Sequence, residues 1–552
     1  MSKKNIAIVL FILFLILNTI KIAFFDSLLI FQSTTLSLSL FNSGIIVKFL
    51  AVSLVFILIS RLNRPFLFIF AYCFQLLYMF ANLSYHIASE GYLHITQYFG
   101  LFSETMELVK HSAVPANNSS GFLFIDTLLF IAVVFLYKDI NFINKKFVFK
   151  KALVVFTCTL VFFAYKWQSV EAKERPAAIL NDRYSCDNNV VHKYGLLAFN
   201  IVDILNLKDA NNRIKRINYG REINGIASDS AKPCIVMIQV ESMDSYIVKT
   251  KHHNEWVTPF LHSLTKKCIY YPYVLSFHKA GSTSDCEFSV INGIEPFDDY
   301  PAMKLRDYNY PNSLVKPLKA AGYEAVAFHG NRGTYFNRNI ALKKMGFNMF
   351  YDMQAMNLPE QGWGASDGDV FDFTMDKLKS LQKPFFCYII TMSSHEPFTL
   401  VNSYYTNNRY NDIKDNATAN YFRAFSYVDG QLERFVNHVK KEYKNSYIFI
   451  YGDHTPPIEN GDGYKRASFT ANNELYEFVP LFLLTPMGTI YEEKSSAAMF
   501  TDFAATVLPS SQIDFKIHSP GRDLTAFPHD SNRLSYLDEK FSRNELFKLI
   551  RQ

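Results

Sequence analysis

The chain has 552 residues, too many for one compact domain, and 49% of them are hydrophobic while 19% are charged. Its mean hydropathy of +0.02 is an average of two unlike parts. Apolar stretches dominate up to about Trp167, and the composition of a globular domain follows. Much of the formal net charge of +6 comes from lysines that flank the apolar stretches, so we expect no nucleic-acid partner.

Five apolar stretches are long enough to cross a membrane, which takes roughly 20 mostly apolar residues. They cover residues 5–24, 44–60, 65–83, 121–137 and 149–165. The first stretch follows only two lysines and continues without a small-residue cleavage site. We therefore read it as a retained anchor and not as a removed signal peptide.

Basic residues gather in alternate connections between these stretches. Lys3 and Lys4 precede the first stretch, Arg61 and Arg64 lie between the second and third, and more lysines lie within 138–151. Loops rich in Lys and Arg stay in the cytoplasm. We therefore predict a cytoplasmic N-terminus and, after five spans, an extracytoplasmic remainder.

Two ionisable residues, Lys48 and Asp126, lie inside predicted spans. Each is a few residues from the outer end of an inward-running helix, so the two share a depth and are candidates for an ion pair. The alternative is a lysine that extends to the interface and an aspartate that faces a wet crevice.

The seven cysteines do not suggest a disulfide framework. Two lie in predicted spans, and the five others are Cys186, Cys234, Cys268, Cys286 and Cys387. Five is an odd number, and two of these cysteines lie inside predicted strands, where buried thiols act as small apolar side chains. At most one or two bridges are compatible with this pattern.

After Trp167, short β-prone runs end in polar motifs. CIVMIQV precedes Glu241, AVAF precedes His329, YIFIYG precedes Asp453, and FFCYIITM leads toward His395. Such runs, alternating with helical segments, are typical of buried strands in a parallel sheet. Open α/β sheets place their sites just beyond the carboxyl ends of the strands, so we expect these residues to converge. A single residue of this kind is more often part of a turn, but four together favour a site.

Glu241, Asp453 and His454 offer two carboxylates and one imidazole, which suit Mn²⁺, Mg²⁺ or Zn²⁺. The absence of a cysteine or a second histidine in this set weakens the case for Zn²⁺. Thr283 lies in a Gly-Ser-Thr-Ser-Asp turn that leads into the helical run DCEFSVI. A hydroxyl at a helix N-terminus and next to a metal is a candidate nucleophile. The alternative is that these polar residues only cap the helix.

The chain resembles the lipoteichoic acid synthases and related phosphoglycerol transferases, in the sulfatase-like branch of the alkaline phosphatase superfamily. The resemblance rests on five motifs and their order: VES, GSTSDCEF, FHGN…FNR, SSHEPF and YGDH. The five apolar stretches and the segment YGLLAFNIVDIL extend this resemblance over nearly the whole chain. It implies a multi-pass helical membrane domain at 1–167, a linker at 168–231, an extracytoplasmic α/β sulfatase-like catalytic domain at 232–525 and a tail at 526–552.

The resemblance also implies roles for individual residues. One divalent ion, with Mn²⁺ expected first, would be held by Glu241, Thr283, Asp453 and His454. A phosphoglycerol pocket would be formed by His329, Arg338 and His395, with Phe336 where the synthases usually have tryptophan. Sulfatases proper mature a Cys or Ser in a Cys/Ser-x-Pro-x-Arg turn, and the run from Cys286 to Val290 lacks both Pro and Arg.

The implied function is a phosphoglycerol transferase of the bacterial cytoplasmic (inner) membrane, with its catalytic domain facing the periplasm or the cell exterior. Thr283 would attack phosphatidylglycerol, His395 would assist the leaving diacylglycerol, and a glycopolymer or polyglycerolphosphate hydroxyl would accept the glycerophosphate. The alternatives are a phosphoethanolamine transferase, a metal-dependent phosphodiesterase and a non-catalytic glycopolymer-binding membrane protein. An intact nucleophile argues against the last. The sequence leaves the acceptor and the oligomeric state open.

Overall fold

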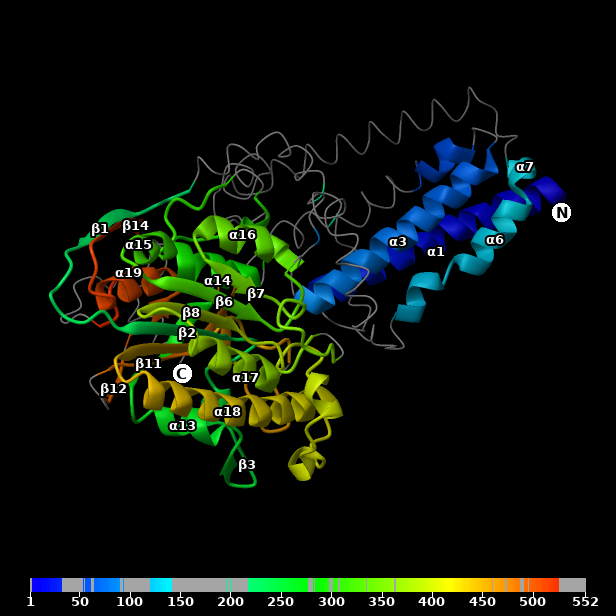
Figure 1. Ribbon diagram of the computed structural model, residues 1–552. Coiled ribbons are helices and arrows are strands. Elements are labelled where there is room, and N and C mark those ends of the chain that lie inside the picture. Colours follow the sequence, from blue (N-terminus) through cyan, green and yellow to red (C-terminus); the bar gives the residue numbers. More distant parts are fainter. Residues whose placement is uncertain are drawn as a thin grey trace. The chain divides into compact units, whose positions relative to one another are not determined.

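The computed structural model describes residues 2–31, 53, 55–60, 64–89, 93, 120–140, 196, 200, 217–276, 281, 283–296, 301–305, 308–333, 335–361, 364–458, 460–471, 474–486, 491–494 and 496–525. The chain divides into two units, Met1–Lys208 and Asp209–Gln552, and each is described here by itself (Figure 1). The predicted span 149–165, the predicted tail 526–552 and Lys48 lie outside the described residues. The predicted domain boundaries stay a prediction.

The described part of the first unit is helical. Its elements are α1 (Lys3–Phe31), α3 (Pro65–Ser89), η2 (Ser120–Phe124), α6 (Thr127–Phe135) and α7 (Tyr137–Ile140). Two segments, Lys3–Phe25 and Pro65–Leu83, are long and apolar enough to cross a membrane, and they match the predicted first and third spans. Gly121–Phe135 is apolar but shorter than a span. The described residues therefore contain two of the five predicted spans at full length, and the count of five stays a prediction.

A fully buried ion pair joins α1 to the start of α6. The Nζ atom of Lys21 lies 2.8 Å from Oδ2 of Asp126. Asn18 and Tyr72 also donate hydrogen bonds to the Asp126 carboxylate, each at 2.7 Å. The expectation that only Lys48 and Asp126 are ionisable within spans was wrong, because Lys21 lies inside the first span and is the partner of Asp126.

The predicted topology has a direct test. Reporter fusions after Tyr137 should be active only in the cytoplasm, because the lysine-rich connection that follows is held inside. Fusions after Trp167 should be active only outside. An external signal from a fusion at Lys145 would show that the number of spans is not five, and would place the second unit on the opposite side of the membrane.

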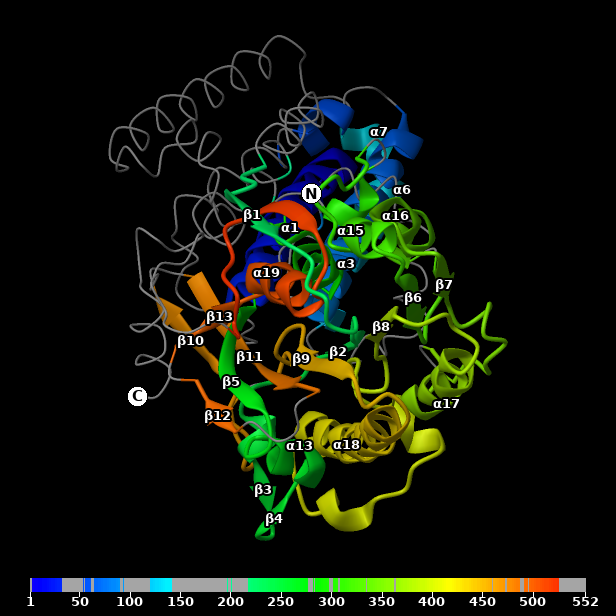
Figure 2. The same cartoon turned by 60° about the vertical axis from the view of Figure 1, so that its left-hand side comes forward.

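A ten-stranded sheet forms the centre of the described second unit, in the order β12-β5-β11-β9-β2-β8-β6-β7, with β10 beside β11 and β13 beside β5 (Figure 2). The strands are β2 (Cys234–Val240), β5 (Ile269–Ser276), β6 (Glu324–His329), β7 (Met349–Tyr351), β8 (Phe385–Ile390), β9 (Ser446–Gly452), β10 (Ser468–Ala471), β11 (Glu474–Leu484), β12 (Glu492–Glu493) and β13 (Ala498–Met499). The strands β9, β2, β8, β6 and β7 run parallel to one another. The four apolar runs of the sequence are β2, β6, β8 and β9, so their prediction as buried parallel strands is confirmed.

Helices cover both faces of this sheet (Figures 1 and 2). One face packs against α13 (Pro259–Leu264), α17 (Asp367–Leu378) and α18 (Asn416–Glu442). The other packs against α14 (Thr283–Asn292), α15 (Val315–Ala320), α16 (Arg338–Met345) and α19 (Thr501–Ser510). Successive residues of a strand point to opposite faces. Val236 and Ile238 of β2 accordingly join the first core, and Ile235 and Met237 join the second.

Smaller elements complete the second unit. Two further strand pairs are β1 (Arg221–Gly225) with β14 (Phe515–Ser519) and β3 (Lys251–His252) with β4 (Glu255–Trp256). The short 3₁₀ helices are η5 (Ile247–Lys249), η6 (Ala302–Lys304), η7 (Tyr335–Asn337), η8 (Leu400–Ser403) and η9 (Asn408–Tyr410). The result is a three-layer α/β domain in which the parallel strands end at one edge.

Candidate active site

Three potential metal ligands meet beyond the ends of the neighbouring strands β2 and β9. Glu241 directly follows β2, and Asp453 and His454 directly follow β9. The Nε2 atom of His454 lies 3.2 Å from Oε1 of Glu241 and 3.8 Å from Oδ1 of Asp453. One ligand atom from each residue can be chosen so that all three lie within 4.8 Å of one another. The predicted convergence of these residues is therefore present in the structure.

The two strand ends approach each other closely because of Gly452. A Cβ atom at this position would lie 2.1 Å from the carbonyl oxygen of Met243, just after Glu241. Any other residue would push the two ends apart, so the glycine of the YGDH motif permits the approach of β9 to the exit of β2.

Thr283 is the first residue of α14 and lies beside this cluster. Its Oγ1 donates a hydrogen bond to Oε2 of Glu241 at 3.2 Å and lies 3.4 Å from Nε2 of His454. The preceding turn is held by the amide of Gly281, which donates to Asp285 at 2.9 Å. Ser284 instead donates to the Gly281 carbonyl at 2.7 Å. Of the two described hydroxyls in this motif, only that of Thr283 is directed at the carboxylates.

Hydrogen bonds from the surrounding backbone and side chains orient the carboxylates. The amides of Ser242 and His454 both donate to Oδ1 of Asp453 at 2.8 Å. The side-chain amide of Gln239 donates to Oδ2 of Asp453 at 3.4 Å. Nδ1 of His454 donates to the carbonyl of Thr455 at 3.0 Å, which leaves Nε2 directed at the cluster. An outer partner of this kind fixes the ring of a metal-binding histidine.

The electrostatics of the cluster favour a cation. Glu241 and Asp453 are almost fully buried. Burial, together with the charge of Glu241, raises the pKa of Asp453 to about 8. Burial acts to lower the pKa of His454, but the carboxylates of Asp453 and Glu241 outweigh it and raise that pKa well above its usual value. Asp453 thus retains a proton near neutral pH unless a positive charge replaces it. Oxygen ligands with one nitrogen fit a divalent metal ion.

The structure also positions the predicted pocket histidines near the cluster. His329 ends β6 and is only 3% exposed, and its Nδ1 donates to the carbonyl of Ile390 at 3.1 Å. Burial, aided by the charge of Arg338, lowers the pKa of His329 to about 3. The ring is therefore neutral at physiological pH, and its Nε2 is a hydrogen-bond acceptor. His395 is half-buried and follows β8. Burial acts to raise the pKa of Glu241, but His454 and, to a smaller extent, His395 outweigh it and lower that pKa, so His395 belongs to the same electrostatic environment.

Arg338 is buried and makes a bidentate ion pair. Its Nε lies 3.0 Å from each carboxylate oxygen of Glu287, and its Nη2 lies 2.6 Å from Oε1. The edge of the guanidinium formed by Nε and Nη2 therefore contacts Glu287. A phosphate contact from Arg338 would have to use its other hydrogens.

Phe336 lies next to this ion pair in an unusual backbone conformation. Its φ is 51° and that of Asn337 is 59°, so two consecutive residues are left-handed just before α16. The Phe336 ring lies 5.4 Å from the guanidinium carbon of Arg338. Left-handed non-glycine residues are costly and cluster at functional sites, which is consistent with the predicted pocket position of Phe336.

Sequence reasoning missed Gln239 and Glu287, and both had a detectable signal. Gln239 is two residues before Glu241, so both side chains leave the strand on the same side. Glu287 is four residues after Thr283, one helical turn along the same face of α14. A search for polar residues at these spacings from each motif residue would have identified them.

The carboxylate, imidazole and threonine set lies at the carboxyl edge of a doubly covered α/β sheet, where open α/β sheets place their sites. A family model described as Sulfatase matches residues 233–513, about half of the chain. The chain belongs to this family. It lacks the Pro and Arg of the sulfatase maturation turn, so Thr283 stands as the nucleophile candidate in place of a modified cysteine or serine.

Two curated relatives are lipoteichoic acid synthases. The chain is 27% identical over 485 residues to lipoteichoic acid synthase 2 of Bacillus subtilis, covering 82% of this chain and 73% of the relative. It is 29% identical over 365 residues to the lipoteichoic acid synthase of Staphylococcus saprophyticus, covering 61% of this chain and 55% of the relative.

A solved structure shares the fold over most of the chain. It is the integral membrane protein lipooligosaccharide phosphoethanolamine transferase A from Neisseria meningitidis. The match has a TM-score of 0.58 at 16% identity and covers 93% of this chain and 96% of that one. At this identity the match speaks for the fold alone.

Proposed function

We propose that the chain is a membrane-anchored phosphoglycerol transferase, which moves glycerophosphate from phosphatidylglycerol to an extracytoplasmic glycopolymer or polyglycerolphosphate. The observation that carries this proposal is the contact of Thr283 Oγ1 with the buried Glu241 carboxylate at 3.2 Å and with His454 Nε2 at 3.4 Å. The names of the curated relatives support the transferred group. The apolar helices α1 and α3 support membrane attachment.

In the first half of the reaction, the Thr283 oxygen attacks the phosphorus of the lipid phosphodiester. The bond from phosphorus to the diacylglycerol oxygen breaks, and that oxygen takes up a proton for which His395 is the proposed donor. Glu241 Oε2 accepts the hydrogen bond of the Thr283 hydroxyl and is positioned for its proton. A divalent ion held by Glu241, Thr283, Asp453 and His454, with Mn²⁺ as the proposed ion, would activate the hydroxyl and offset developing negative charge.

In the second half, a hydroxyl of the acceptor attacks the phosphorus of glycerophospho-Thr283. The bond from phosphorus to Thr283 breaks, and the acceptor carries the glycerophosphate away. The acceptor hydroxyl gives its proton to the deprotonated His395, and Thr283 recovers the proton held by Glu241. A covalent route of this kind replaces one difficult displacement by two easier ones.

One feature of the pocket favours a glycerol headgroup over an ethanolamine headgroup. The acceptor nitrogen of the neutral His329 would serve either headgroup, so the distinction comes from the nearby acid. The nearby acid, Glu287, is held by Arg338 through both carboxylate oxygens, so it is not available to an ammonium group. Arg338 and Phe336 would then line the pocket, with Arg338 contributing positive charge toward the phosphodiester.

Comparison of two lipid donors tests the proposal. Purified full-length protein with Mn²⁺ should release diacylglycerol from phosphatidylglycerol at least about tenfold faster than from phosphatidylethanolamine, the ratio given by a preference of about 1.4 kcal/mol. Thr283→Ala protein supplies the background rate. Equal rates, or faster release from phosphatidylethanolamine, would reassign the donor and favour the phosphoethanolamine transferase alternative. Release without any acceptor product would favour a phosphodiesterase.

A further inference from the structure

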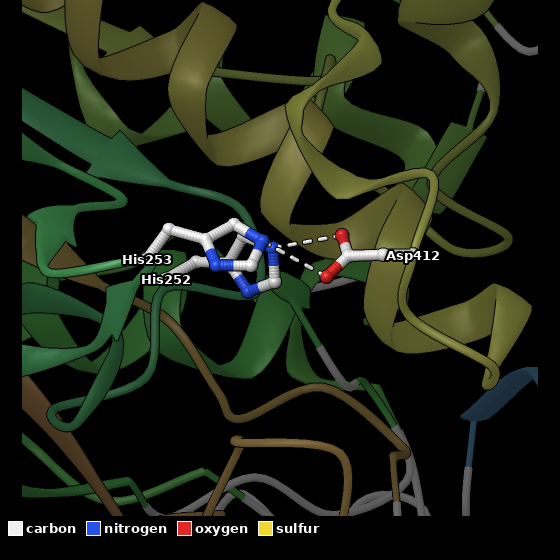
Figure 3. A group of neighbouring side chains, drawn as sticks. All are labelled: His252, His253 and Asp412. Carbon is white, nitrogen blue, oxygen red and sulfur yellow. Dashed lines mark hydrogen bonds and ion pairs between the residues drawn. The ribbon is translucent and has the colours of Figure 1, made fainter.

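A second cluster of metal-binding side chains lies on the surface of the second unit, built from residues outside the candidate active site. His252 and His253 come from the hairpin of β3 and β4, and Asp412 comes from the segment after η9. Figure 3 shows both imidazole rings directed at the same carboxylate. The Nε2 atoms of His252 and His253 lie 2.9 Å from Oδ1 and Oδ2 of Asp412, respectively.

The convergence of two adjacent histidines is a consequence of the turn. Neighbouring residues in an extended strand point to opposite sides. Here His253 and Asn254 have φ of 48° and 63°, so the chain reverses at once and both rings come to the same side. Their ring centroids lie 4.1 Å apart. The left-handed conformation is uncommon for a non-glycine residue, although Asn and His tolerate it better than most.

The surrounding contacts hold the hairpin against the segment that carries Asp412. The Nη2 atom of Arg409 donates to the carbonyls of His252 and Glu255 at 2.8 and 2.7 Å. The carboxylate of Glu255 lies 3.2 Å from Arg409 Nη1 and offsets its charge. The ring of His252 also packs 5.4 Å from that of Tyr410. The three side chains are therefore preorganised by the fold and do not have to be gathered by a ligand.

We propose that His252, His253 and Asp412 form a surface site for a borderline divalent transition metal, with Zn²⁺ as the representative ion. Two imidazole nitrogens and one carboxylate oxygen are ligands that such ions prefer, and their ligand atoms lie within 4.8 Å of one another. The oxygen-rich cluster at Glu241 has only one nitrogen, so the two sites differ in the ion they favour. The side chains of His253 and Asp412 are 67% and 52% exposed, so an ion has direct access from solvent.

Hydrogen bonding alone would explain the same geometry if each imidazole simply donated a proton to the carboxylate. The two explanations predict different measurements. A metal ion would displace the proton from the Nε2 atom of each histidine and would bind with a defined stoichiometry. Binding would also link two segments about 160 residues apart, so zinc would raise the unfolding temperature.

The test compares zinc retention by full-length protein and matched variants. His253→Asn keeps a residue that tolerates the left-handed turn and removes one ligand, and Asp412→Asn keeps the shape and removes the charge. After equilibration with Zn²⁺ and desalting, each variant should retain fewer zinc ions than the wild type, by one ion per chain. His518→Asn is the control, since His518 also lies near a surface carboxylate, 3.9 Å from Glu222, but lacks a second imidazole beside that contact. It should retain as much zinc as the wild type.

A second measurement separates this site from the one at Glu241. In Glu241→Gln protein, where the other site is weakened, Zn²⁺ should still raise the unfolding temperature, and adding His253→Asn should abolish the shift. Failure of the proposed transferase activity would leave this result unchanged. Equal zinc retention by wild type, His253→Asn and Asp412→Asn would overturn the proposal and leave a hydrogen-bonded cluster only.

Discussion

Replacement of Thr283 by alanine should reduce turnover by about 10³-fold or more, because it removes the proposed nucleophile while the other groups stay in place. The side chain is 8% exposed at the first position of α14 and its contacts are to Glu241 and His454, so its loss should leave the fold intact. The measurement is acceptor-dependent release of diacylglycerol. Mass spectrometry should find glycerophosphate on the wild-type peptide that contains Thr283.

Ser284→Ala is the matched control for this prediction. Ser284 donates its hydrogen bond to the Gly281 carbonyl and is not directed at the carboxylates. Its removal should reduce activity much less than removal of Thr283. Full activity in Thr283→Ala protein together with loss in Ser284→Ala protein would move the nucleophile by one residue.

Replacement of Glu287 by glutamine should destabilise the second unit by about 3–5 kcal/mol, because it leaves the charge of Arg338 buried without a partner. Both side chains are at most 3% exposed, so solvent cannot compensate. The expected result is a large fall in the unfolding temperature of the full-length protein, measured by thermal unfolding at fixed metal concentration.

Two further variants sharpen this prediction. Asp376→Asn breaks an exposed ion pair with Lys379 and should change the unfolding temperature little. The double variant Glu287→Leu/Arg338→Leu removes both charges and should recover much of the lost stability, since apolar residues can replace a buried pair. It should nevertheless remain inactive if Arg338 positions the donor. A small effect of Glu287→Gln alone would contradict the buried-pair interpretation.

The parallel strands were predictable because each is a short, continuous apolar run that ends in a polar motif. The antiparallel strands β5 and β11 were not, and proline is the reason. Pro272 and Pro480 interrupt their sequences, and proline argues against a strand unless it lies at an edge or a bulge. The pairing of β11 with β5 shifts register between Val479 and Leu481, so the prolines lie in an irregular part of the ladder.

The candidate site was predictable to a similar extent and for a related reason. Its ligands lie directly after predicted strands, so sheet geometry alone brings Glu241 to Asp453. The ion pair between Arg338 and Glu287 was not predictable in this way, because its residues are 51 positions apart and lie on different helices. Lys21 was overlooked although it lies inside the first predicted span, residues 5–24.

The ion pair between Lys21 and Asp126 has a consequence for the biogenesis of the protein. A lysine inside an apolar helix that crosses a membrane is costly until it is neutralised. Its partner is synthesised 105 residues later. The first helix therefore depends on a later helix to neutralise its lysine. If a generic signal anchor replaced the first helix, Asp126 would lose its cation.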